Sequence, residues 1–203
     1  NRNANLLDLG CNDGSWSLKI GCKIGTKNIY GIDNAKKQLE KAKKKGIRTA
    51  YGDLNLPLPY RSGIFGVIHS NQVIEHLTET KIFVDEIYRV LKKGGYAIIS
   101  TENLASWHNV FSLFFGWQPF SLAVISGYKI GIGNPLSIHK KENIFSPLEH
   151  IRVFSYEAFI EIFKERGFIT EKILCAGYYP LPDFFARLDP RQSAFLTIKI
   201  RKK

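Results

Sequence analysis

Apolar runs alternate with helix-like patterns through the first hundred residues, and this alternation restricts the fold more than any other feature. Unbroken apolar runs predict buried strands, and apolar residues spaced by three or four predict helices. Predicted strands cover 5–9, 28–33, 47–51, 65–70 and 96–101, and predicted helices cover 14–24, 35–45 and 79–91, the last ended by Gly94 and Gly95. Such strands separated by helices are typical of a parallel sheet covered on both faces. We therefore expect a doubly wound α/β fold.

The end of the chain departs from this pattern. A helix is predicted between Ser155, a candidate cap, and Gly167, and strands are predicted at 168–175 and 194–200. The span between these two strands is too short for a crossover helix, so the last strand is expected to run antiparallel to the others. The prediction is a seven-stranded mixed sheet of Rossmann-like type in a single domain, residues 1–203.

An aromatic-rich insertion is predicted at about 104–150. Its stretch 109–128 carries no charge over 20 residues, which is the length of a membrane span. Gln118 and Pro119 lie in the middle of that stretch and serines interrupt it. We therefore expect a lid over a pocket, or a patch that dips into a bilayer, rather than a spanning helix.

Charge and cysteine content restrict the partners and the compartment. The formal net charge is +11, but many lysines fall in the predicted helix 35–45, which favours a solvated helix face over an anionic partner. Three cysteines, Cys11, Cys22 and Cys175, form no C-x-x-C pair, which predicts a reduced, cytoplasmic protein without a zinc site. The sequence contains no methionine, even at position 1, so we expect a segment to precede Asn1.

The loop after the first predicted strand reads GCNDG, residues 10–14. In a doubly wound sheet this loop lies where ligands bind, and its glycines allow a tight turn and close approach of the backbone. The dinucleotide pattern G-x-G-x-x-G is not met, because Asn12 stands where a second glycine is needed. Asp13 would also repel a phosphate. The loop therefore favours a ligand with a positive or neutral centre, although a purely structural turn remains an alternative for Gly10 and Gly14.

Carboxylates follow the next two predicted strands. Asp33 lies 23 residues after Gly10, where a carboxylate can accept both hydroxyls of a ribose, although Asp33 can also cap the following helix. Asp53 in YGDL can receive an adenine amine, with Leu54 against the ring, or can serve only as a turn residue. Together with Asp8 they predict an adenosine pocket of negative character, which suits a sulfonium and an ammonium better than a pyrophosphate.

The ordered set of motifs resembles the class I S-adenosylmethionine-dependent methyltransferases of the small-molecule type, similar to those of ubiquinone and menaquinone biosynthesis. The segments that carry the resemblance are LLDLGCNDG, GIDNA, GDLNLPLP, SNQVIEHL, LKKGGYAIIST and HIRVFSYEAFIEIFKERGF. They cover nearly the whole chain apart from 104–149. The resemblance implies S-adenosylmethionine as cofactor, S-adenosylhomocysteine as product and no bound metal.

The resemblance also implies roles for single residues. The cofactor-binding residues it implies are Asp8, Gly10, Cys11, Asn12, Asp13 and Gly14 around the methionine part, Asp33 at the ribose, Asp53 and Leu54 at the adenine, Asn71 beside the methyl donor, and also Asn34. Two features depart from the family pattern. Asn12 replaces a frequent glycine, and the helices that usually precede the first strand are not seen.

Methyl transfer mainly requires alignment and desolvation of the acceptor, and it needs a general base only where the acceptor retains its proton. His76 is the predicted base, with a packing or cofactor-contact role as the alternative, and His108 and His150 come next. The rings of the insertion favour an apolar, ring-bearing or lipid- or glycan-linked acceptor, with possible peripheral membrane contact, unless they only form the core of a lid. The oligomeric state is left open.

Three other functions remain as alternatives. An RNA methyltransferase would fit the basic charge and the tail KIRKK, but SNQV is unlike an N-P-P-[YF] motif, so a nucleic-acid partner is not expected. A catalytically silent, methyltransferase-like subunit would not need the intact cofactor positions. A nicotinamide-dependent oxidoreductase is disfavoured by the missing glycine and by the antiparallel last strand.

Overall fold

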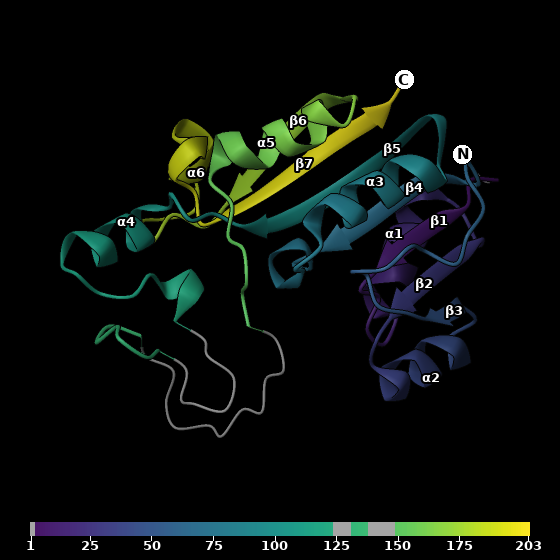
Figure 1. The fold of residues 1–203 in the computed structure, drawn as a ribbon, viewed down its shortest axis with the longest axis horizontal. Coiled ribbons are helices and arrows are strands. Elements are labelled where there is room, and N and C mark those ends of the chain that lie inside the picture. The colour runs from purple at the N-terminus through teal and green to yellow at the C-terminus, as the bar shows by residue number, and fades with distance from the viewer. Residues whose placement is uncertain (1–2, 124–130, 138–148) are drawn as a thin grey trace.

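The computed structural model describes residues 3–123, 131–137 and 149–203. Seven strands form one sheet in the order β3-β2-β1-β4-β5-β7-β6 (Figure 1). The strands are β1 Leu6–Leu9, β2 Ile29–Asp33, β3 Arg48–Tyr51, β4 Phe65–Asn71, β5 Leu91–Glu102, β6 Phe168–Ala176 and β7 Phe195–Lys202. The first five strands pair in parallel, and β7 is antiparallel to both β5 and β6. The predicted seven-stranded mixed sheet with an antiparallel last strand is confirmed.

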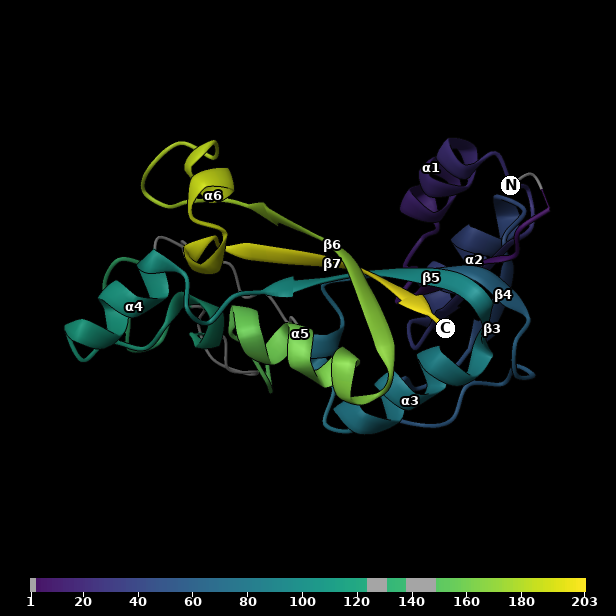
Figure 2. The same ribbon diagram turned by 90° about the horizontal axis from the view of Figure 1, so that it is seen from above.

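Helices cover both faces of this sheet (Figure 2), with α1 and α2 on one side and α3 and α5 on the other. The α-helices are α1 Ser15–Ile24, α2 Lys36–Lys44, α3 Thr80–Val90, α4 Trp107–Phe114, α5 Tyr156–Glu165 and α6 Phe185–Leu188. The 3₁₀ helices are η1 Ile74–His76, η2 Phe120–Leu122 and η3 Pro190–Gln192. The doubly wound layering that the alternation predicts is thus present.

Helical spacing explains which side chains form the two cores. Phe83 and Ile87 of α3, with Phe159 and Phe163 of α5, are buried in the larger core. On the other face a smaller core contains Leu6, Ile29, Ala42, Ile47 and Val67. The lysines of α2 are exposed, while Leu39 and Ala42 of the same helix are buried. This confirms that the lysine run is a solvated helix face.

The largest difference from the predicted elements lies between α3 and β5. Helix α3 ends at Val90, and β5 begins directly at Leu91 rather than near residue 96. Gly94, with a φ of 74°, and Gly95 therefore lie inside the strand, so the prediction that they end the helix is wrong. Leu91 pairs with Phe65, and a register shift follows in β4. This pairing continues the sheet through two glycines that the sequence pattern presents as a helix stop.

The insertion leaves the sheet at the end of β5 and returns at Phe154, where Asn103 and Phe154 form a parallel bridge. It contains α4 and η2, and its residues 124–130 and 138–148 lie outside the described part of the chain. Part of the uncharged stretch 109–128, and His139, fall in those gaps. Within the described segments, no helix combines the length and the apolar character that crossing a bilayer requires.

Candidate cofactor cleft

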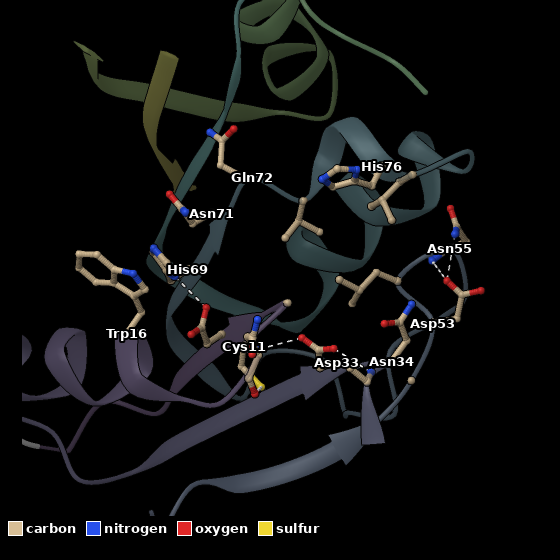
Figure 3. A pocket seen from close by; sticks show the side chains of 18 of the residues that line it. Cys11, Trp16, Asp33, Asn34, Asp53, Asn55, His69, Asn71, Gln72 and His76 are labelled. Carbon is tan, nitrogen blue, oxygen red and sulfur yellow. Dashed lines mark hydrogen bonds and ion pairs between the residues drawn. The ribbon is translucent and has the colours of Figure 1, made fainter. Parts of the chain in front are cut away.

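A cleft of about 670 Å³ lies beyond the C-terminal ends of β1, β2 and β4 (Figure 3). This is where open α/β sheets bind ligands, and the volume is within the usual range of small-molecule sites. The predicted residues that line it are Asp8, Gly10, Cys11, Asn12, Asp13, Asp33, Asn34, Asp53, Leu54, Asn71 and His76. Among the predicted cofactor residues, Gly14 does not line the cleft. Asp33 and Asp53, at the ends of neighbouring strands, share it.

The two glycines of the loop are needed for packing as well as for the turn. Gly10 has a φ of 76°, and a Cβ there would lie 2.5 Å from Cγ2 of Val73. Gly14 has a φ of 75°, and its Cβ would lie 2.2 Å from Cδ1 of Ile47. Side chains at either position would be both strained and obstructed. Gly14 therefore allows α1 to approach α2 and does not face the ligand.

The side chain of Cys11 is a small buried filler beneath this loop. Burial, and next to it the carboxylates of Asp8 and Asp33, raise the pKa of its thiol to about 12. The thiol is therefore protonated and unreactive at neutral pH. Cys11 contributes to the cleft as one of the residues that line it and not as a thiolate.

Asp33 connects the loop to the end of β2. Its Oδ2 accepts a hydrogen bond of 2.8 Å from the backbone N–H of Asn12, and its Oδ1 accepts one of 2.8 Å from the N–H of Ala35. Asn12 itself is in the left-handed region, with a φ of 47°. Each carboxylate oxygen has a second lone pair that can accept a hydroxyl. Asp33 thus closes a turn before α2 and does not cap it, because the N-cap is Ala35 and has no side-chain cap. Its remaining lone pairs leave it able to bind a ligand.

Asp53 forms a turn and also lines the cleft. Its Oδ1 accepts hydrogen bonds of 2.9 Å from both the backbone N–H and the side-chain amide of Asn55. No hydrogen bond from the described residues reaches its Oδ2. Leu54 is buried beside it, with 8% of its surface exposed. The pair thus offers one open acceptor oxygen next to an apolar surface.

Asp13 braces the loop against α2. Its Oδ2 lies 2.6 Å from Nζ of Lys45, and both of its oxygens accept hydrogen bonds from Ser15. The hydrogen bond from Lys45 holds the pKa of this carboxyl below its usual value. The ammonium group of Lys45 therefore already neutralises Asp13. Asp13 is positioned to hold the loop and not to neutralise a ligand.

A buried pair beneath the cleft was not expected from the motifs. Nδ1 of His69 lies 2.7 Å from Oδ1 of Asp8, and the Ser17 hydroxyl donates a hydrogen bond of 2.5 Å to Oδ2 of Asp8. His69 also lines the cleft. Asp8 and His69 are register partners on the parallel strands β1 and β4. Aligning the two predicted strands, with alternate residues on one face, is the sequence signal that could have found this pair.

A smaller cavity of about 250 Å³ adjoins the cleft on the side of α1. Trp16, His69 and Asn71 line both spaces. The remaining residues that line the smaller cavity are apolar, namely Ile20, Val67, Ile68 and Ile98. A polar cleft and an apolar cavity are thus joined at the end of β4.

Backbone strain marks the turn after β4. The Ser100 hydroxyl donates a hydrogen bond of 2.6 Å to the Asn71 side-chain oxygen. Gln72, which lines the cleft, has a φ of 52° and donates its backbone N–H to the Ser100 carbonyl. Non-glycine residues with positive φ cluster at functional sites. Both such residues in the described part of the chain, Asn12 and Gln72, line this cleft.

His76 meets a residue that follows the insertion. Its Nδ1 donates to the Glu149 carbonyl over 2.8 Å, and its ring centroid lies 4.8 Å from that of His150. Burial lowers the pKa of His76, so the imidazole is neutral near pH 7. His150 donates in turn to the Ser121 carbonyl, whereas His108 packs against Phe120 and Tyr179 and does not line the cleft.

Glu75 lies beneath the two histidines and is fully buried. Its Oε2 accepts a hydrogen bond from the Thr101 hydroxyl, and its Oε1 has no partner among the described residues. Burial raises the pKa of this carboxyl to about 7. One ligand atom each from Glu75, His76 and His150 lie within 4.8 Å of one another, so this group could hold a metal ion. Sequence reasoning expected no metal and could not foresee the contribution of His150.

The charge of the cleft favours a cationic ligand. Its lining includes five carboxylates, from Asp8, Asp13, Asp33, Asp53 and Glu149. No lysine or arginine is found among the described residues that line it. A pyrophosphate would meet unfavourable charge here, whereas a sulfonium or an ammonium would be stabilised.

Comparison with known families agrees with this geometry. Residues 7–99 match the family model described as a methyltransferase domain, and this range includes β1 from Leu7 onward, β2 to β4 and all the residues predicted for the cofactor site and for the base His76. This match supports a class I S-adenosylmethionine-dependent methyltransferase. S-Adenosylmethionine is accordingly its cofactor, and the acidic lining and the glycine loop of the cleft fit this ligand.

Individual relatives of this methyltransferase act in quinone biosynthesis. The chain is 28% identical over 156 residues to a ubiquinone biosynthesis O-methyltransferase of Pelagibacter ubique, covering 75% of this chain and 60% of the relative. It is 29% identical over 121 residues to a demethylmenaquinone methyltransferase of Lactococcus lactis, covering 54% and 48%. The methyltransferase described here therefore spans about half to three fifths of the length of these relatives.

A solved structure confirms the fold along the chain. A methyltransferase from Thermotoga maritima, described as a possible histamine N-methyltransferase, superposes with a TM-score of 0.66 at 19% identity. The match covers 99% of this methyltransferase and 83% of that protein. At this identity the likeness establishes the fold and leaves the acceptor open.

Proposed function

We propose that the protein transfers a methyl group from S-adenosylmethionine to a small-molecule acceptor. The observation that carries this proposal is the shared cleft of Asp33 and Asp53, lined by carboxylates and by no described lysine or arginine. Two carboxylates at neighbouring strand ends match an adenosine, and the negative lining matches a sulfonium. The names of both relatives describe small-molecule methyltransferases, which supports a small molecule over RNA as the acceptor.

Each part of the cleft has a role in this proposal. Asp33 and Asn34 hold the ribose, and Asp53 with Leu54 holds the adenine. Asp8, Gly10, Cys11, Asn12 and Asp13 form the wall around the methionine part, and Asn71 lies beside the methyl group. Gly14 contributes by letting α1 pack closely beneath the loop. The strained backbone at Asn12 and Gln72 is held by hydrogen bonds from their N–H groups to the Asp33 carboxylate and the Ser100 carbonyl.

The chemistry asks little of the protein beyond alignment. Bound S-adenosylmethionine supplies a methyl group on a positively charged sulfur, so the leaving group is already activated. Asn71 and Gln72 orient the acceptor at the end of β4, and the buried surroundings exclude water. His76 accepts the acceptor's proton where the acceptor is a hydroxyl. Its donated Nδ1–H leaves the Nε2 lone pair for this role, and its lowered pKa keeps it neutral.

The acceptor in this proposal is apolar or bears a ring, either free or linked to a lipid or a glycan. The cavity lined by Ile20, Val67, Ile68 and Ile98 supports an apolar acceptor. Peripheral contact of an otherwise cytoplasmic enzyme with a membrane belongs to the same proposal, because α4 carries exposed rings such as Phe114. All three cysteines are free thiols, as a reducing compartment requires.

Isothermal calorimetry with S-adenosylhomocysteine tests the proposal directly. We expect the protein to bind this nucleoside, and Asp33→Asn to weaken binding at least tenfold, because an amide offers only one acceptor oxygen. Asp85→Asn is the matched control, since Asp85 lies on α3 in ion pairs with Lys81 and Arg166 and does not line the cleft. Absence of binding, or binding of NADH in its place, would contradict the proposal. Metabolites from cells with and without the protein should then differ by the mass of one CH₂ group.

A further inference from the structure

Helix α4 turns its polar side inward and its apolar side outward. Asn109 and Ser112 are buried, with 0% and 2% of their surfaces exposed. On the outer side Phe114 is 82% exposed, Phe111 58% and Leu113 55%. A helix on the surface of a water-soluble domain has the opposite arrangement. The outer side of α4 therefore matches an apolar medium better than water.

Specific hydrogen bonds fix this orientation. The Asn109 amide donates to the Asn103 carbonyl over 3.0 Å and to the Ser121 hydroxyl over 2.8 Å. The Ser112 hydroxyl donates to the His108 carbonyl and accepts from the Asn134 amide. Rotating α4 to bury its rings would leave these buried polar groups unpaired, which is costly. The outward rings are thus a consequence of a satisfied polar core.

A second segment extends the same apolar surface. Nε1 of Trp107, at the start of α4, donates over 2.7 Å to the hydroxyl of Tyr178, and the ring of His108 packs against Tyr179. Helices α4 and α6 accordingly lie at the same end of the molecule in both views (Figures 1 and 2). The end surface is defined by Trp107, Val110, Phe111, Leu113, Phe114, Phe115, Tyr179, Leu181, Phe184 and Leu188.

The concentration of apolar side chains in this end surface is unusual. It holds ten of the eighteen large apolar side chains that are exposed in the described part of the chain. Scattered exposed residues need no explanation, but many exposed apolar side chains gathered at one end of a molecule indicate an interaction site. Trp107 and Tyr179 each combine an apolar ring with a polar atom, as side chains at a lipid–water boundary do.

Charge at the end surface indicates the chemistry of the partner. Helix α4 carries no charged residue, and Arg187 is exposed between Phe184 and Leu188 of the α6 segment. The half-buried Asp189 accepts hydrogen bonds from Tyr178 and Trp107, and the exposed Asp183 accepts one from the Gly177 N–H. No described carboxylate pairs with the Arg187 guanidinium. A guanidinium among exposed rings matches a phosphate at the edge of an apolar layer.

We propose that the end surface docks on an anionic phospholipid bilayer, with the rings of α4 and α6 entering the interface and Arg187 contacting lipid phosphate. The net charge of +11 adds long-range attraction to such a membrane. Protruding single side chains suit a deformable lipid layer better than the complementary surface of a folded protein. This inference rests on the membrane contact within the proposed function and not on methyl transfer itself.

Vesicle flotation tests the inference with the full chain. The probes are phosphatidylcholine vesicles and phosphatidylcholine vesicles with a third of phosphatidylglycerol. We expect binding to the anionic vesicles, weakened about fivefold by Arg187→Gln, because one basic residue near a charged surface contributes about that factor. The double substitution F111S and F114S should reduce binding roughly tenfold or more on both kinds of vesicle.

The matched control removes two exposed apolar side chains elsewhere. Tyr51 and Leu174 are 60% and 52% exposed and lie outside the end surface. The double substitution Y51S and L174S should leave vesicle binding unchanged. Equal loss in the control, or no binding of the unaltered chain, would overturn the inference.

Two further measurements separate the alternatives. Sedimentation without vesicles tests whether the end surface binds a second copy of the chain instead of lipid. If the unaltered chain forms a dimer that F111S and F114S dissociate, and if it does not bind vesicles, lipid docking is overturned. Calorimetry with S-adenosylhomocysteine should give the same affinity for F111S and F114S as for the unaltered chain. If F111S and F114S abolish vesicle binding but not nucleoside binding, the cofactor assignment stands. If the unaltered chain binds vesicles but not the nucleoside, the docking surface stands and the cofactor assignment fails.

Discussion

Nδ1 of His69 lies 2.7 Å from Oδ1 of Asp8, where the two residues are register partners on β4 and β1. Asp8 is 3% exposed, so its carboxylate depends on His69 and Ser17 for hydrogen bonds. We expect His69→Leu to lower the free energy of unfolding by about 1–3 kcal/mol, because a buried acceptor loses its partner. Urea denaturation measures this change. His69→Gln, which keeps a donor, should lose less, and equal losses would show that the hydrogen bond is unimportant.

Gly14 is expected to be far less tolerant of substitution than Gly63, another glycine with positive φ. A Cβ at Gly14 would lie 2.2 Å from Cδ1 of Ile47, whereas nothing lies within 4 Å of a Cβ at Gly63, which has a φ of 65°. Gly63→Ala should cost about 1–2 kcal/mol of unfolding free energy from backbone conformation alone, and Gly14→Ala clearly more. Ile47→Val removes the obstructing methyl group, so it should recover part of the loss in a double variant. Additive effects of the two substitutions would contradict this account.

The acid limb of the pH–rate profile should report His76. Burial lowers the pKa of this imidazole below its usual 6.5, and a base is active only when unprotonated. With a hydroxyl acceptor, kcat/KM should therefore fall as the pH decreases through that lowered pKa and stay level above it. His76→Gln should reduce kcat by about 10²–10⁴-fold and abolish the limb. A variant that keeps both turnover and limb would rule out His76 as the base.

Glu75 should make the folded state less stable at alkaline pH. Its pKa is about 7 in the folded protein and 4.5 in the reference state, so the folded state binds more protons between these values. The Glu75 contribution to stability is therefore complete below about pH 4.5 and is lost as the pH rises through about 7. The slope is at most about 1.4 kcal/mol per pH unit. Glu75→Gln should flatten the dependence of unfolding free energy on pH, measured by urea titration from pH 5 to 8. An unchanged slope would show that burial of this carboxyl is not the cause.

The fold could be predicted in large part because its elements carry strong local signals. The predicted strand 65–70 differs from β4 by one residue at its C-terminal end, and the predicted helix 79–91 differs from α3 by one residue at each end. The antiparallel last strand followed from the short span before residue 194. Gly94 and Gly95 were misread because only pairing of Leu91 with Phe65, 26 residues earlier, keeps that segment in the sheet.

Cleft residues could be predicted where they lie at the end of a predicted strand. They could not be predicted where the site depends on contacts between segments that are far apart in the sequence. Asp33 is the last residue of β2 and Asp53 lies two residues after β3, so topology alone brings them into the same cleft. Glu75, His76 and His150 meet because the chain returns after the insertion, and no local pattern reports that return. The outward rings of α4 likewise depend on hydrogen bonds to residues outside the helix.

The bridge between Asn103 and Phe154 brings the start and the end of the insertion together, and the N–H of Leu104 donates to the Phe154 carbonyl over 2.9 Å. Closing a loop costs free energy that grows only slowly with its length. The insertion between Asn103 and Phe154 can therefore be replaced by a segment of another length and sequence. The sheet and the nucleoside contacts then stay unchanged. Evolution can in this way diversify the acceptor and the membrane attachment of such an enzyme without having to rebuild its methyl-donor site.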